Sequence, residues 1–119
     1  MATMIRNHLS GCADGVPVAL AIDTGTYTTI HTVTTTTADF EEVWIWLANI
    51  STITETVTLA FGGSADVNKV KILVPAQSVV LAVPGWTFQG KGSPVVITGA
   101  STTAAKVNVH GYINLIDDA

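Results

Sequence analysis

The run VWIWLA at residues 43–48 constrains the fold more than any other part of the chain. Alternate residues of a β-strand point to opposite faces. The two faces of this strand would carry Val43, Ile45 and Leu47 on one side and Trp44, Trp46 and Ala48 on the other. Both faces are apolar, whereas a strand in a small β-sandwich usually has only one covered face. The second face therefore needs a partner subunit, a docking surface or a local flap.

Further short runs of β-type residues, separated by turn residues, continue to residue 116. We expect strands at residues 18–22, 27–33, 42–50, 55–61, 69–74, 78–83, 86–88, 95–98 and 106–116. Regular spacing of short strands is the pattern of an all-β sandwich or barrel, and no long stretch keeps a helical period. The sequence predicts an all-β fold, a single antiparallel β-sandwich that is jelly-roll-like and has about eight strands.

The chain of 119 residues has the length of one domain. Residues 1–15 show no periodicity and contain two glycines, so we expect an extended N-terminal arm outside the sandwich that contacts a neighbour. Residues 16–119 then form the β-sandwich domain. Pro84-Gly85 is a strong turn signal between two strands, and the small residues 99–105 predict a connection.

Hydrophobic residues make up 48% of the chain and charged residues only 12%. This composition favours a homo-oligomer that hides apolar surface. No apolar run approaches the roughly 18 residues that a membrane span needs, so we expect no membrane partner. The net charge is −4 and only Lys69 and Lys71 cluster, so the basic footprint of a nucleic-acid-binding protein is missing. A single cysteine, Cys12, allows no intrachain disulfide.

No residue cluster argues for chemistry. The histidines His8, His31 and His110 lack the close spacing of a zinc or hydrolytic site, and we interpret them as surface or interface histidines. Adjacent carboxylates such as Glu41 and Glu42 point to opposite faces of a strand and do not converge. We therefore expect no enzyme, with no catalytic residues, no cofactor and no metal.

Several segments, taken in order, resemble the small β-sandwich proteins of tailed-bacteriophage virions, including head decoration (cement) proteins. The resemblance is carried by residues 26–28 (TYT), 48–51 (ANIS), 55–59 (ETVTL), 72–81 (ILVPAQSVVL), 86–88 (WTF), 99–101 (GAS) and 107–113 (VNVHGYI). It covers about residues 26 to 116 of the sequence. One departure is Gln77, which stands where the family pattern usually has glycine.

The resemblance implies a virion structural role. We expect a head decoration protein that assembles as a homotrimer, binds and stabilises the assembled capsid through the major capsid protein or another virion protein, and passes through the host cytoplasm during assembly. The expected interface residues are Trp44, Trp46, Trp86, Phe88 and Ile5. The alternatives are a neck, tail or fibre component of the virion, or a carbohydrate-binding module in which Trp86 stacks on a sugar.

Overall fold

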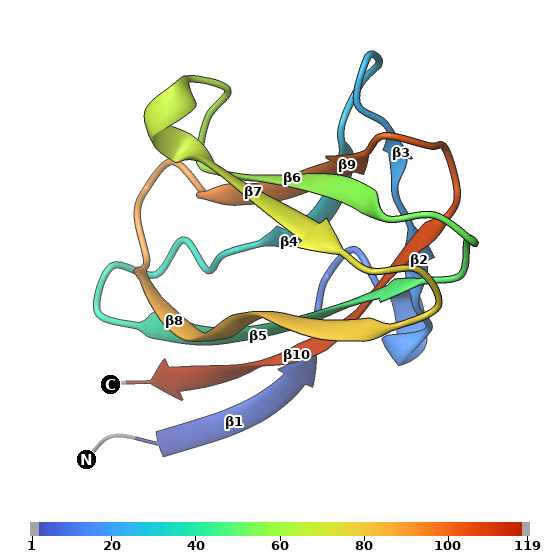
Figure 1. The fold of residues 1–119 in the computed structure, drawn as a ribbon. Coiled ribbons are helices and arrows are strands. Elements are labelled where there is room, and N and C mark those ends of the chain that lie inside the picture. The colour runs from blue at the N-terminus through green and yellow to red at the C-terminus, as the bar shows by residue number, and fades with distance from the viewer. Residues whose placement is uncertain (1–2, 118–119) are drawn as a thin grey trace.

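The computed structural model describes residues 3–117, which form a sandwich of two β-sheets (Figure 1). The strands are β1 (Thr3–His8), β2 (Val18–Ala19), β3 (Ala21–Ile22), β4 (Thr28–Thr32), β5 (Phe40–Asn49), β6 (Glu55–Phe61), β7 (Lys69–Val74), β8 (Val79–Gln89), β9 (Val96–Ser101) and β10 (Val107–Asp117). Two short 3-10 turns, η1 (Ala13–Gly15) and η2 (Asp66–Asn68), lie in the connections. The described part of the chain contains no helix long and apolar enough to cross a membrane.

The strand order confirms the jelly-roll-like sandwich. Sheet A has the order β1-β10-β5-β8, with β2 beside β1 on the same edge of β10. Sheet B has the order β3-β9-β6-β7, with β4 on the β3 edge of β9. From β4 onward the chain changes sheets at every connection except the β6–β7 hairpin, and such crossing connections between two packed sheets are typical of a jelly roll. Residues 3–117 form ten strands where about eight were expected, and the short β3–β9 pair is parallel.

The core follows the alternation of the sequence. Val43, Ile45 and Leu47 of β5 have no exposed surface and point between the sheets. Val57 and Leu59 of β6 face them from sheet B and are equally buried. Val43, Ile45 and Leu47 therefore share one face of β5, as the alternation predicted.

Strand boundaries differ from the sequence prediction at three places. Residues 79–83 and 86–88 belong to one strand, β8, because Pro84 pairs with Trp44 and the bulge at Gly85 does not end the strand. Strand β9 continues through Ser101, into the segment expected to be a connection. The strand expected at 18–22 is divided at Leu20, where the chain passes from sheet A to sheet B.

The expectation of an N-terminal arm outside the sandwich is wrong, because the N-terminal segment adds a strand to sheet A. Strand β1 pairs with β10 over six residues as an added edge strand. All six of its residues are exposed, which explains the missing periodicity. The chain then turns inward, and Leu9 and Cys12 join the core with 0% and 2% exposed surface. Whether β1 also contacts a neighbouring subunit stays a prediction.

A buried polar pair fastens this turn to β4. The backbone N–H of Ser10 donates to Nδ1 of His31 (3.0 Å). The other ring nitrogen then carries the proton and donates to Oε1 of Glu41 (2.5 Å). The N–H of Thr34 donates to the second carboxylate oxygen of Glu41 (3.2 Å). His31 is only 4% exposed, so it is a core histidine, and the expectation of a surface or interface role for it is wrong.

Candidate interaction surface

The outer face of sheet A carries a cluster of three aromatic rings. Trp44 and Trp46 lie on β5, and Tyr112 lies opposite Trp44 on β10. The ring centroids of the two tryptophans are 6.2 Å apart, and Tyr112 lies 6.1 Å from Trp44 and 5.8 Å from Trp46. Alternation forces this grouping, because the intervening residues of β5 fill the core. The second apolar face expected from the sequence is therefore present, and its aromatic rings are half-buried by one another.

Polar side chains bound the aromatic cluster on its β1 side. The indole N–H of Trp44 donates to Oε1 of Glu42 (2.7 Å), and Nδ2 of Asn114 donates to the same oxygen (2.9 Å). These two hydrogen bonds, the first above all, hold the pKa of Glu42 below its usual range. Arg6 of β1 donates to Asn114 and places its guanidinium 4.4 Å from the ring centre of Tyr112. The tryptophan N–H is thus satisfied within the subunit, which leaves the ring surfaces for contact.

The bulge in β8 makes room for Trp44. Gly85 has φ +75°, a conformation that favours glycine. A Cβ at this position would lie 2.8 Å from Cζ2 of Trp44. The Pro84-Gly85 pair, which looked like a turn in the sequence, therefore shapes the seat of an indole ring.

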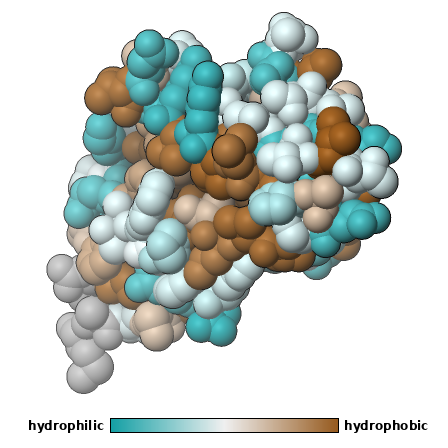
Figure 2. All heavy atoms as spheres, viewed as in Figure 1, coloured by the Kyte–Doolittle hydropathy of each residue, from teal (hydrophilic) through white to brown (hydrophobic). Residues whose placement is uncertain are grey.

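The apolar surface continues from the rings onto edge strand β8. Leu81 lies opposite Trp46, and Val79 lies opposite Ala48. Leu81 is 41% exposed and Val79 is 63% exposed. We call the surface formed by Trp44, Trp46, Tyr112, Leu81 and Val79 the tryptophan face. Figure 2 shows apolar side chains gathered over β7 and β8 on the side of the molecule seen there.

The five expected interface residues fall into three places. Trp44 and Trp46 lie together on the tryptophan face. Trp86 and Phe88 pair with the inward-facing residues of β5 and pack on Phe61 of β6, with ring centroids 5.4 and 5.6 Å from it. Trp86 keeps 39% of its surface exposed at this edge. Ile5 lies on β1 and is 44% exposed.

Sequence reasoning missed two members of the surface, Tyr112 and Leu81. In the sequence Tyr112 alternates with apolar residues and has the polar neighbours His110 and Asn114 on its own face, whereas its ring packs against both tryptophans. Leu81 reads as one more apolar residue in a buried run, and only the register with Trp46 places it outside. Both residues could have been placed from the strand pairing. Residues that lie opposite each other on paired strands share a face, so knowing that Tyr112 pairs with Trp44 and Leu81 with Trp46 puts both on the tryptophan face.

The described residues contain no group of three or more His, Cys, Asp or Glu side chains that could hold a metal ion. Burial raises the pKa of the Cys12 thiol, which disfavours the reactive thiolate. The chemistry that the surface offers is therefore apolar and aromatic contact.

Comparison with protein-family models and with curated proteins finds no match to this sequence. The functional argument consequently depends on the surface itself and on the resemblance noted in the sequence. A jelly roll hosts many unrelated functions, so the fold alone does not decide among them.

Proposed function

We propose that this protein is a structural component of a tailed-bacteriophage virion, a head decoration protein that assembles with copies of itself and stabilises the assembled capsid. The tryptophan face carries this proposal. It joins three aromatic rings to exposed aliphatic side chains on one sheet. Exposed apolar patches of this kind mark sites where a protein contacts another protein. Aromatic residues also dominate the energy of protein interfaces. The resemblance of residues 26 to 116 to virion β-sandwich proteins supports the choice of partner.

The proposed activity is adhesion. A protein that binds the assembled shell better than the free subunits stabilises the shell by mass action. Linked copies in an oligomer add avidity, because the second contact forms at high effective concentration. The homotrimer follows from the resemblance and gives each assembly several contacts with the capsid.

The test is to mix the purified protein with undecorated heads at low and high salt, and to measure bound copies and the heat resistance of the particles. Contacts that are mainly apolar survive about 1 M salt, where the Debye length is roughly 3 Å. We expect binding at both salt concentrations and a higher temperature of head disruption. Loss of binding at high salt would reject the apolar mechanism.

The same experiment separates the alternatives. Purified tails, necks and fibres are tested beside the heads, and binding to these parts without binding to heads would assign the protein to another virion station. A carbohydrate-binding module that uses Trp86 would bind soluble glycans with quenching of tryptophan fluorescence and would bind no virion part.

A further inference from the structure

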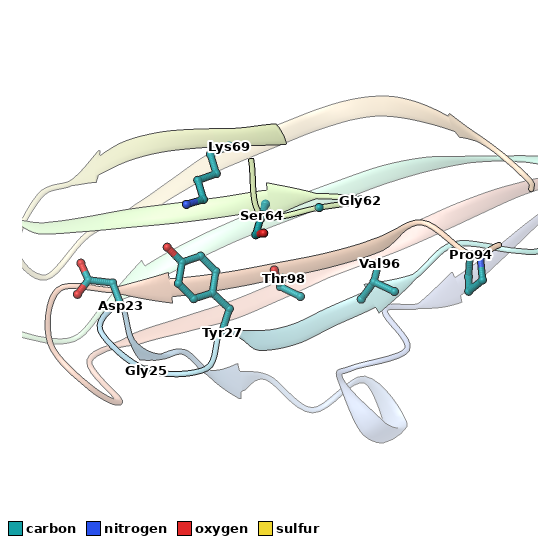
Figure 3. A pocket seen from close by; sticks show the side chains of 11 residues that line it. Asp23, Gly25, Tyr27, Gly62, Ser64, Lys69, Pro94, Val96 and Thr98 are labelled. Atoms are coloured by element: carbon teal, nitrogen blue, oxygen red, sulfur yellow. The ribbon is translucent and has the colours of Figure 1, made fainter. Parts of the chain in front are cut away.

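A groove lies on the outer face of sheet B, on the opposite side of the sandwich from the tryptophan face. Its volume is about 620 Å³, within the range of small-molecule sites. Ala60 of β6 and Thr98 of β9 are cross-strand neighbours that form its floor. The loop containing Asp23 and Tyr27 forms one wall, and the loop after β6 together with Lys69 forms the other (Figure 3).

Small residues keep this groove open. Ala60 is 3% exposed and offers only a methyl group to the floor. Gly62 has φ +80°, and a Cβ on Gly63 would lie 3.0 Å from Oδ1 of Asn68. Nδ2 of Asn68 donates to the backbone oxygen of Phe61 (2.9 Å), which fixes the turn of this wall. The hollow is therefore shaped by local backbone geometry.

Polar side chains without partners converge on the groove. Among the described residues, the side chains of Asp23, Tyr27, Ser64 and Thr98 accept or donate no hydrogen bond. Nζ of Lys69 lies 5.9 Å from the ring centre of Tyr27, and Lys69 forms no ion pair with Asp23 or with another described residue. In Figure 3 the tips of Asp23, Tyr27 and Lys69 gather at one end of the groove.

The other end of the groove is apolar. Val96 and Pro94 line it, and Ser64 and Thr98 lie between them and the polar end (Figure 3). A ligand that fills the groove would therefore place hydrogen-bonding groups beside Asp23 and Lys69 and carbon-bound hydrogens beside Val96 and Pro94.

We propose that this groove binds a carbohydrate, one or more uncharged sugar rings. A sugar hydroxyl both donates and accepts, so neighbouring hydroxyls satisfy the acceptor Asp23 and the donor Lys69 together. A free anion would meet the Asp23 carboxylate, and a free cation would meet the Lys69 ammonium, so a neutral polyhydroxyl ligand suits the groove best. The C–H face of a sugar ring matches the aliphatic surfaces of Val96 and Pro94 at the apolar end. The site is separate from the tryptophan face and from Trp86, and it does not depend on the proposed virion role.

The test is an NMR titration of the ¹⁵N-labelled protein with glucose, galactose, N-acetylglucosamine and the trisaccharides maltotriose, cellotriose and chitotriose. We expect at least one of these sugars to shift the amide signals of Gly62, Gly63 and Thr98 saturably. The tryptophan indole signals should not move. No saturable shift with any of the six sugars, or shifts centred on Trp86, would overturn the proposal.

Two variants test the polar end, each with a matched control. Asp23→Asn and Lys69→Met should each weaken binding about tenfold, because each alters a charged hydrogen-bonding group. Asp66→Asn and Lys71→Met change the same residue types outside the groove lining, and Lys71 lies on the same strand as Lys69. We expect the controls to bind like the unaltered protein. Equal affinities for the two groove variants and their controls would contradict the site, whatever the outcome of the capsid experiment.

Discussion

The substitution Leu81→Glu tests whether the tryptophan face is the contact surface between subunits. Leu81 lies on edge strand β8 opposite Trp46 and is 41% exposed. In an isolated subunit the glutamate side chain reaches water but gives up the three-fifths of Leu81 that is already covered, so the free energy of unfolding should fall by about 1 kcal/mol. In an oligomer that covers this face, the same carboxylate would be enclosed beside the aromatic rings.

The size of the effect follows from these exposures. Complete burial of a leucine side chain is worth about 2 kcal/mol, so covering the exposed two-fifths of Leu81 contributes about 0.8 kcal/mol. A carboxylate that is enclosed without a partner costs about 3 kcal/mol or more. Together these amount to about 4 kcal/mol per contact, or roughly a 700-fold larger dissociation constant.

Analytical ultracentrifugation over a range of protein concentrations measures the assembly, and urea unfolding checks that the variant is folded. The matched control is Leu73→Glu, which places the same change at a 68% exposed leucine on β7 of sheet B. We expect Leu81→Glu to dissociate to monomers and Leu73→Glu to assemble normally. If the unaltered protein is a monomer at micromolar concentration, or if both variants assemble alike, the reasoning that links the tryptophan face to self-assembly is refuted.

Two further predictions concern the strands around this face. Leu9→Ala should lower the free energy of unfolding by about 2–5 kcal/mol, because Leu9 is fully buried. Deletion of residues 1–8 should lower it less, since β1 buries no side chain. Urea unfolding of both variants checks this, and a larger loss for the deletion would contradict it. Glu42→Gln should lose stability relative to the unaltered protein near neutral pH. The folded-state pKa of Glu42 lies below its ordinary value of 4.5, so its ionised form stabilises the fold above that pH and the contribution disappears as the pH falls through the lowered pKa. Melting curves of the two proteins should therefore converge in acid, and a constant difference down to low pH would reject the role of the carboxylate.

Alternation in the sequence predicted the fold class and the division of β5 into two apolar faces. It succeeded because Val43, Ile45 and Leu47 alternate strictly with large residues, and period-two alternation in a strand has one geometric meaning. It failed at Pro84-Gly85, because a bulge and a turn use the same residue types. Only the pairing of β8 with a long neighbouring strand decides between these two structures.

The N-terminal segment was misjudged for a related reason. An edge strand that covers no core has no alternation to detect, so β1 resembles an arm in the sequence although it pairs with β10 throughout. The groove residues were equally hidden. Lys69 reads as edge protection on a strand, and nothing in its neighbourhood in the sequence connects it with Asp23 and Tyr27, which lie in the loop between β3 and β4.

The two outer faces of the sandwich differ in chemistry: the outer face of sheet A is mainly aromatic and apolar, and the groove on the outer face of sheet B carries polar side chains. Sheet A presents three aromatic rings, and the N–H of Trp44 is already satisfied by Glu42, so another protein can cover this indole without leaving its donor unpaired. Sheet B presents polar side chains whose hydrogen-bonding capacity is unused within the subunit, so covering it by an apolar surface would be costly. Self-assembly through sheet A would consequently leave the groove of sheet B facing outward. An adhesive subunit built in this way can stay attached through one face while the other remains free for a small polar ligand.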